Sequence, residues 1–154
     1  MPVVVDKKVP AFSCMATGGK KWKLGDAAGK KLVIYFYPKD NTSGCTKEGE
    51  AFRDLYPSFK KAGTVVVGVS PDSLQSHEKF KEKMAFPFEL LSDEDRSLCQ
   101  LFDVWKEKSM YGRKYMGIER STFLVDERGV LRREWRKVKV PGHADEVLAA
   151  ASAL

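Results

Sequence analysis

Two apolar runs set the framework of the predicted fold. Residues 32–37 (LVIYFY) and 64–69 (TVVVGV) are nearly continuous apolar segments, which is typical of strands covered on both faces. Between them, residues 45–61 carry apolar side chains at spacings of three and four, which predicts a helix with one apolar face. Gly63 ends this helix, and Pro57 predicts a kink or an early break within it.

The rest of the chain continues this alternation and closes with two strands joined by a turn. We expect a helix at 74–84 capped by Asp72 or Ser73, a strand at 86–91, a helix from Asp93, a loop at 104–117, strands at 121–125 and 130–138, and a last helix from Gly142 to about Leu154. Unstructured loops as long as 104–117 are often functional. Cys99 falls on the apolar face of the third predicted helix, so core packing is its expected role.

The N-terminal residues 9–24 predict a short β-hairpin, because Thr17-Gly18-Gly19 is a turn sequence between two apolar arms. Cys14 lies in the first arm, as a packed or half-buried thiol. Strands and helices that alternate early, followed by a late hairpin, predict an α/β fold with a central mixed sheet flanked by helices. Residues 1–154 are expected to form a single domain.

Composition excludes several classes of protein. With 43% hydrophobic and 31% charged residues the chain resembles an ordinary globular protein, so disorder is not expected. No apolar run reaches the ~20 residues of a membrane helix, and the N-terminus lacks a secretory signal, so we expect a cytosolic protein without a membrane partner. The net charge of +6 raises the possibility of nucleic-acid binding. However, the densest basic cluster, at 128–139, alternates with apolar positions as a solvated strand face does.

The cysteines and histidines do not form a metal or redox motif of their own. The chain has three cysteines, Cys14, Cys45 and Cys99. An odd number of widely spaced cysteines is unlike a secreted disulfide framework. His77 and His143 are too far apart to predict a zinc site, and we expect a helix-surface residue and a residue near a helix cap. The chain also lacks a CxxC pair and the glycine patterns of nucleotide sites, so we predict neither a disulfide exchanger, a metal nor a cofactor.

Cys45 stands out by its position. It follows the strand at 32–37 and the turn-forming residues 38–44, and it opens the predicted helix. The unpaired N–H groups and the positive dipole end of a helix start favour the thiolate, which is the reactive form of cysteine. The alternative is a small buried apolar residue, because free cysteines are among the most buried residue types.

The residues around Cys45 carry a resemblance to a known family. Pro38, Thr42 and Cys45 match the pattern PxxxTxxC of peroxiredoxins, and Arg120 precedes a strand as the arginine of that family does. The longer strings YFYPKDNTSGCTKE, ERSTFLVDERG and VPGHADEVL resemble the subfamily named after bacterioferritin comigratory protein, also called the Q type. The resemblance runs from about Val9 to Leu148. It implies a thioredoxin-like fold and a thiol peroxidase acting on hydrogen peroxide and organic hydroperoxides.

The resemblance also implies a role for each matched residue. Cys45 would attack the peroxide and become a sulfenic acid. Arg120 would hold the thiolate and stabilise the departing oxygen. Thr42 would hydrogen-bond the peroxide, the N–H groups of Gly44 and Cys45 would contact the same oxygens, and Pro38 would shield the pocket from water. Taken singly, Thr42 would be interpreted as a helix cap and Arg120 as a surface ion-pair partner; their combination favours the site.

One departure from the subfamily concerns the second cysteine. Many members carry it five positions after the first, where this chain has Glu50, and others carry it in the following helix, where residues 74–84 hold none. Ser43 also replaces a common proline. Three routes could reduce the sulfenic acid: an external thiol in a one-cysteine cycle, which we favour, or reaction with Cys99 or with Cys14.

The expected partners follow from this chemistry. Electrons would come from thioredoxin, glutaredoxin or a small thiol, and members of the subfamily are often monomers. The competing hypothesis is a redox sensor, in which oxidation of Cys45 is recognised by a partner protein. A basic nucleic-acid-binding domain is a third hypothesis, and it predicts salt-dependent retention on DNA.

Overall fold

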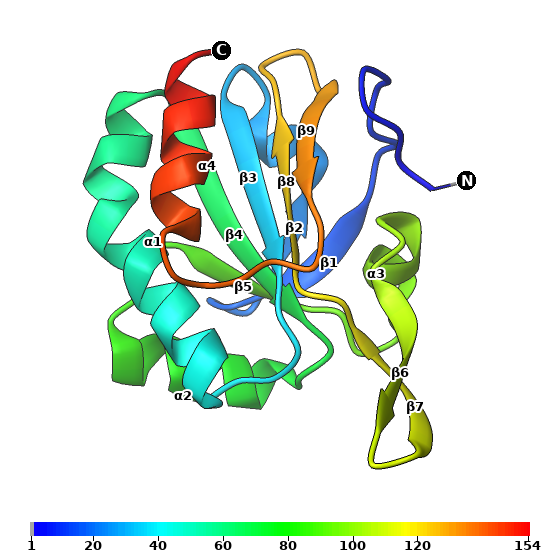
Figure 1. Cartoon of the computed structure of the whole chain (residues 1–154). Coiled ribbons are helices and arrows are strands. Elements are labelled where there is room, and N and C mark those ends of the chain that lie inside the picture. Colours follow the sequence, from blue (N-terminus) through cyan, green and yellow to red (C-terminus); the bar gives the residue numbers. More distant parts are fainter. Residues whose placement is uncertain (1) are drawn as a thin grey trace.

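A computed structural model describes residues 2–154, and a seven-stranded mixed sheet lies at its centre (Figure 1). The strands of this sheet are β1 (Ser13–Ala16), β2 (Lys20–Lys23), β3 (Lys31–Phe36), β4 (Thr64–Ser70), β5 (Glu89–Ser92), β8 (Ser121–Val125) and β9 (Leu131–Trp135). They are arranged in the order β2-β1-β5-β4-β3-β8-β9. Strands β3, β4 and β5 are mutually parallel, and the other pairs are antiparallel.

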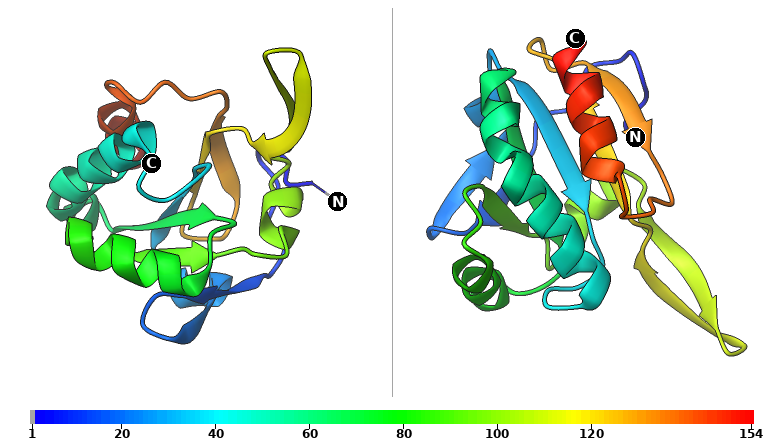
Figure 2. Two further views of the ribbon diagram at one scale, coloured as in Figure 1. Left: turned by 90° about the horizontal axis from the view of Figure 1, so that it is seen from below. Right: turned by 60° about the vertical axis from the view of Figure 1, so that its left-hand side comes forward.

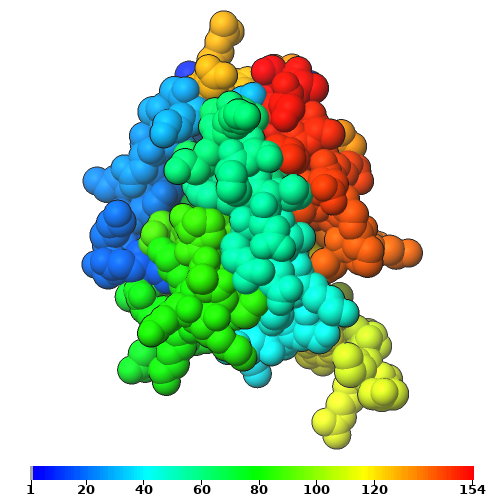
Figure 3. All heavy atoms as spheres, turned by 90° about the vertical axis from the view of Figure 1, so that its left-hand side faces the viewer, coloured from blue at the N-terminus to red at the C-terminus, as the bar shows by residue number. Residues whose placement is uncertain are grey.

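Helices cover both faces of the sheet. They are the 3-10 turn η1 (Leu24–Ala27) and the α-helices α1 (Ser43–Lys61), α2 (Leu74–Met84), α3 (Ser97–Leu101) and α4 (His143–Ser152). Helices α1, α2 and α4 lie on one face, and α3 lies on the other (Figures 1 and 2). In the space-filling view of the first face these three helices close over the sheet (Figure 3). The predicted thioredoxin-like α/β fold is confirmed.

The alternation of side chains along β3 divides the core into two clusters. Leu32, Ile34 and Phe36 pack toward α3, whereas Val33 and Tyr35 pack toward α1, α2 and α4. All six residues of β3 are buried, which explains why its sequence is almost entirely apolar. Tyr35 thus lies beneath α1, in the same cluster as the cysteine that the sequence singles out.

Gly68 of β4 is required by close packing. It pairs with Tyr35 of β3, and a Cβ atom at Gly68 would lie 2.8 Å from Cζ of that tyrosine and 2.9 Å from Cδ2 of Leu90. The missing side chain therefore makes room for an aromatic ring under α1. The ring of Tyr35 in turn stacks on Phe52 of α1, with 4.6 Å between the ring centroids.

Helix α1 differs from its prediction at both the start and the proline. It begins at Ser43, two residues before the predicted start at Cys45, with Thr42 as the extended N-cap residue. Pro57 neither ends nor divides the assigned helix, which continues to Lys61. Phe52 and Phe59, on either side of the proline, are both fully buried, so packing holds the two parts of the helix against the sheet.

Several other predictions are confirmed, with shifts at their ends. The N-terminal hairpin forms from β1 and β2, Cys14 lies in its first arm, and Ser73 caps α2. The strands predicted at 86–91 and 130–138 are shorter, because β5 begins at Glu89 and β9 ends at Trp135. The helix predicted from Asp93 begins at Ser97 instead.

The prediction of a loop at 104–117 is wrong. Its residues form a separate two-stranded antiparallel hairpin, β6 (Trp105–Met110) and β7 (Arg113–Ile118). The hairpin projects from the body of the molecule, away from the main sheet (Figures 1 and 2), and most of its residues are exposed. Two strands that expose both faces show no alternation of apolar and polar residues, so the pattern that identifies a strand is missing.

None of the helices in residues 2–154 combines the length and the apolar character needed to cross a membrane.

Candidate active site

Cys45 lies in the first turn of α1, directly after the loop that leaves β3. It is the third residue of the helix, so its own N–H and that of Gly44 have no acceptor within the helix. The turn residues around it do not leave it exposed, since only 2% of its surface is accessible. Burial alone would fit a packing role, so the neighbours of the sulfur decide between packing and reactivity.

Arg120 is the charged neighbour of the Cys45 sulfur. The residue lies between β7 and β8, and its Nη2 donates to Sγ of Cys45 at 3.3 Å. Its Nη1 donates to Oε1 of Glu48 at 2.5 Å. Gly44 leaves room for the guanidinium, because a Cβ atom there would be 3.2 Å from Nη2. One guanidinium thus connects the thiol with a carboxylate one helical turn further along α1.

Glu48 makes the electrostatics of this group unusual. Only 1% of its surface is accessible, and burial raises the pKa of its carboxyl to about 7, although the positive charge of Arg120 acts in the opposite direction. Burial lowers the pKa of Arg120, but Glu48 and Cys45 together raise it above its ordinary value. Sequence reasoning missed Glu48, although its spacing of three from Cys45 places both on one helix face.

Thr42 and Pro38 lie in the loop between β3 and α1. The hydroxyl of Thr42 donates to the carbonyl oxygen of Lys39 at 2.8 Å instead of capping the helix, while its own carbonyl accepts from the N–H of Thr46 at 2.9 Å. Thr42 is exposed and Pro38 is half-buried. Because the Thr42 hydroxyl proton is used inside the loop, its oxygen remains able to accept a further hydrogen bond.

Comparisons with known proteins decide the family. Residues 5–134 match the model of the AhpC/TSA family. The peroxiredoxin Bcp of Bacillus subtilis is 51% identical over 148 residues, which cover 96% of this chain and 94% of that protein. A structure of the Xanthomonas campestris bacterioferritin comigratory protein, solved to explain its alkyl peroxide reduction, is 54% identical with a TM-score of 0.88, covering 92% of this chain and 90% of that one.

The chain belongs to the Bcp, or PrxQ, type of peroxiredoxin. The structure of a cysteine-to-serine mutant of PrxQ from Xylella fastidiosa has a TM-score of 0.93 and 43% identity, over 99% of this chain and 98% of that one. The resemblance inferred from the motifs is therefore confirmed, and with it the class of enzyme, a thiol peroxidase.

The other two thiols of this peroxiredoxin lie on the opposite face of the sheet. Cys45 packs in the cluster under α1, whereas Cys14 and Cys99 both belong to the cluster around α3. Sγ of Cys14 donates to the carbonyl of Ser92 at 3.3 Å, and burial raises the pKa of Cys14 to about 12. Burial and the nearby Asp93 also raise the pKa of Cys99, which is fully buried as the sequence predicts.

Neither histidine of this peroxiredoxin is on the surface. His77 was expected to be a helix-surface residue, but it is fully buried. Its spacing of three from the buried Phe80 would have placed it on the inner face of α2. His143 is the first residue of α4, as expected near a cap, yet it too is buried, with Nε2 2.8 Å from the hydroxyl of Thr122, and burial lowers its pKa to about 4.

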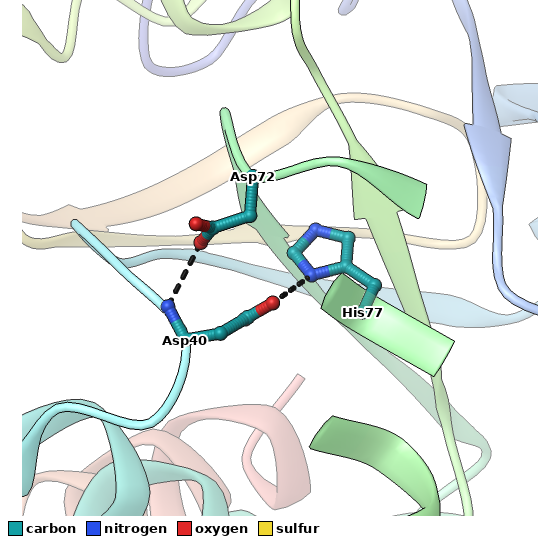
Figure 4. A group of neighbouring side chains, drawn as sticks. All are labelled: Asp40, Asp72 and His77. Atoms are coloured by element: carbon teal, nitrogen blue, oxygen red, sulfur yellow. Dashed lines mark hydrogen bonds and ion pairs between the residues drawn. The ribbon is translucent and has the colours of Figure 1, made fainter. Parts of the chain in front are cut away.

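His77 gathers with Asp72 and with Asp40, which belongs to the loop that carries Pro38 and Thr42 (Figure 4). The three residues offer ligand atoms within 4.8 Å of one another, the spacing of a candidate metal site. However, Nδ1 of His77 is hydrogen-bonded to Oδ2 of Asp40 at 2.7 Å, and Oδ2 of Asp72 accepts from the N–H of Asp40 at 2.8 Å. These atoms bind one another, which explains the cluster as a hydrogen-bonded network.

Proposed function

We propose that Cys45 is the nucleophile of this peroxidase. Its thiolate attacks the terminal oxygen of a hydroperoxide, so that an S–O bond forms and the O–O bond breaks. The terminal hydroxyl stays on sulfur as a sulfenic acid. The leaving oxygen takes up a proton and departs as water or an alcohol. The hydrogen bond of 3.3 Å from Nη2 of Arg120 to Sγ is the observation that carries this proposal.

Arg120 serves two stages of that reaction. Before attack it stabilises the thiolate, and during attack it stabilises the charge that moves to the leaving oxygen. Its second nitrogen is bound to Glu48 at 2.5 Å, which fixes the guanidinium plane next to the sulfur. This preorganised cation supports catalysis because it needs no rearrangement when charge develops.

Thr42, Gly44 and Pro38 shape the place of the substrate. The Thr42 hydroxyl already donates to the carbonyl of Lys39, so we assign it as the acceptor of the hydroperoxide O–H. The N–H groups of Gly44 and Cys45 at the start of α1 donate to the peroxide oxygens. Pro38, half-buried beside them, keeps water out.

The substrates are hydrogen peroxide and organic hydroperoxides. The alkyl peroxide reduction of the Xanthomonas campestris relative, 54% identical to this chain, supports the organic class. The proposed chemistry requires only the O–OH group, because every contact proposed with the substrate is made to its two peroxide oxygens.

A one-cysteine cycle regenerates the thiol. Glu50 stands where many relatives carry a second cysteine, and Cys14 and Cys99 pack on the far side of the sheet from Cys45. A disulfide needs Cα atoms within about 7 Å of each other. Packing in separate clusters on opposite faces of the sheet opposes such an approach between Cys45 and either of the other two cysteines. Thioredoxin, glutaredoxin or a small thiol therefore reduces the sulfenic acid. We further propose a monomeric, single-domain enzyme of the cytosol, where free thiols such as these three are maintained.

The experiment is coupled NADPH oxidation with thioredoxin, thioredoxin reductase and either hydrogen peroxide or cumene hydroperoxide. We expect sustained turnover that is lost in Cys45→Ser. The redox-sensor hypothesis predicts instead that Cys45 is oxidised once, in stoichiometric amount. In that case neither thioredoxin, glutaredoxin nor a small thiol sustains turnover. Mass spectrometry after one equivalent of peroxide tests the cycle: a sulfenic acid adduct on Cys45 supports it, and a crosslink to Cys14 or Cys99 contradicts it.

A further inference from the structure

The buried imidazole of His77 faces acceptors on both sides. Nδ1 lies 2.7 Å from Oδ2 of Asp40, and Nε2 lies 2.9 Å from the carbonyl oxygen of Leu91. A carbonyl can only accept, and so can a carboxylate in its ionised form. Burial alone would raise the pKa of Asp40, but hydrogen bonds from His77, Tyr37 and Ser76 lower that pKa below its ordinary value, which favours the ionised form.

The third polar neighbour of the ring offers no proton. The hydroxyl of Ser70 lies 3.5 Å from Nε2 of His77, but it donates its proton to Oδ2 of Asp72 at 2.6 Å. Each ring nitrogen of His77 therefore has to supply its own proton to be satisfied. The arrangement corresponds to an imidazolium buried against a carboxylate, and both polar ends of the ring are then paired.

The partner carboxylate belongs to the loop of the active site. Asp40 lies two residues after Pro38 and two before Thr42, and its side chain is as well bonded as that of His77. Its Oδ1 accepts from the hydroxyl of Tyr37 at 2.6 Å, and its Oδ2 accepts from Ser76 of α2 at 2.7 Å as well as from His77. Figure 4 shows the Asp40 side chain pointing from this loop toward α2.

This pair connects three elements that the sequence separates. His77 comes from α2, its Nε2 reaches β5 at Leu91, and its Nδ1 holds the loop that precedes α1. Elsewhere in the loop, the Thr42 hydroxyl bonds only to Lys39 of the same loop. A longer contact, from Nζ of Lys83 to Oδ1 of Asn41 at 3.5 Å, also joins α2 to the exposed part of the loop. The side chain of Asp40, which Ser76 and His77 both contact at 2.7 Å, is therefore the main point at which α2 fixes the position of the residues that meet the peroxide.

We propose that His77 is a positioning residue of the peroxidase reaction: as a buried imidazolium paired with Asp40, it holds the loop carrying Pro38 and Thr42 in the geometry that peroxide attack requires. It acts through Asp40 and touches neither the sulfur nor the substrate. This inference rests on the proposed attack of Cys45 on the peroxide. It adds that the loop geometry depends on the hydrogen bond that α2 contributes to Asp40 through His77.

Two neutral variants of one residue separate this role from general stability. In His77→Asn the amide nitrogen stands near the position of Nδ1 and can still donate to Asp40, whereas in His77→Gln it stands near Nε2 and can donate only to Leu91. Each variant loses the ring and one hydrogen bond. The proposal predicts that His77→Gln slows the reaction of Cys45 with hydrogen peroxide about 10- to 100-fold, and that His77→Asn retains most of the rate.

The decisive readout is the single-turnover rate with peroxide, compared with the rate of alkylation of Cys45 by iodoacetamide without peroxide. Alkylation depends on the thiolate beside Arg120, which His77 does not contact, so it should stay close to the wild-type rate in both variants. Loosened packing would instead expose Cys45 and accelerate alkylation. Leu131→Ala, which empties a fully buried position of β9 remote from the loop, is the control for lost stability and should leave both rates unchanged.

Equal loss of the peroxide rate in both amide variants, or a wild-type rate in His77→Gln, would overturn the proposal. A wild-type protein that fails to react with peroxide would refute the proposed function instead, so the two failures are distinguishable. If the variants do not fold, the wild-type protein provides the test. Side-chain nitrogen NMR at neutral pH should show both ring nitrogens of His77 protonated. A single protonated ring nitrogen would contradict the charged pair.

Discussion

Nη2 of Arg120 lies 3.3 Å from Sγ of Cys45, although 75 residues separate the two in the chain. The contact depends on a missing side chain and an ion pair. Gly44 lets the guanidinium lie against the start of α1, and Glu48 holds its other nitrogen. The start of a helix and a fixed cation thus lie against the same sulfur.

Arg120→Lys is expected to slow the reaction of Cys45 with peroxide by about 100-fold, comparable to the loss of one oxyanion-hole donor. Lysine keeps the charge but cannot bind Glu48 and Cys45 with two nitrogens in one plane. Stopped-flow measurement of single-turnover oxidation by hydrogen peroxide checks this. Arg132→Lys, at a half-exposed arginine of β9, is the matched control and should react like wild type. A wild-type rate in Arg120→Lys would show that charge alone suffices.

The elements that bury an apolar face were predictable, because burial leaves a pattern in the sequence. Strands β3 and β4 are continuous apolar runs, and α1 shows the spacing of one apolar face. The proximity of Arg120 to Cys45 came from the family resemblance instead, since no periodicity connects residues so far apart. Helix ends were less certain, because the start of α1 at Ser43 depends on backbone geometry that many residues can adopt.

The features that the sequence did not reveal are of two kinds: strands without apolar periodicity, and polar side chains inside the core. The β6–β7 hairpin exposes both faces, so its strands resemble a loop. His77 was expected on the helix surface and Glu48 was not singled out, yet both are buried, and each binds a residue distant in the sequence. Such pairs become visible only when the fold brings the two segments together.

Cys14→Ala and Cys99→Ala are expected to leave steady-state peroxidase turnover unchanged. Both thiols pack on the other face of the sheet from Cys45, and burial raises the pKa of each, so neither is a ready nucleophile for a sulfenic acid. Coupled NADPH oxidation at saturating thioredoxin measures the effect. Loss of turnover in one variant, together with a sulfenic acid that accumulates on Cys45, would identify that cysteine as the resolving thiol.

Glu48→Gln is expected to change how stability depends on pH. Burial raises the pKa of Glu48 from its ordinary 4.5 to about 7, so folding favours the protonated carboxyl. Its contribution to stability is fully present below about pH 4.5 and is lost as the pH rises through about 7, to a maximum of about 3 kcal/mol. The free energy of unfolding of wild type minus that of the variant should therefore fall across this range.

Urea denaturation of both proteins between pH 4.5 and 8 measures that difference directly. The other titrating groups are common to the two proteins and cancel in the subtraction. Glu50→Gln, two residues further along α1 and partly exposed, serves as the matched control for removing a carboxyl from this helix. Parallel stability curves for wild type and Glu48→Gln would mean that Glu48 remains ionised across the whole range beside Arg120.

His143→Gln is expected to show the opposite pH dependence. Burial lowers the pKa of His143 from its ordinary 6.5 to about 4, so folding favours the neutral ring, whose Nε2 lies 2.8 Å from the hydroxyl of Thr122. The stability it contributes is fully present above about pH 6.5 and is lost as the pH falls through about 4, by roughly 3 kcal/mol. Glutamine keeps a polar group near Nε2 but does not titrate, so the variant should lose less stability on acidification. Urea denaturation at pH 7 and pH 4.5 measures both proteins. If their stabilities fall equally between these values, the ring of His143 is solvated when it is charged, and the acid sensitivity of the fold arises from its buried carboxylates instead.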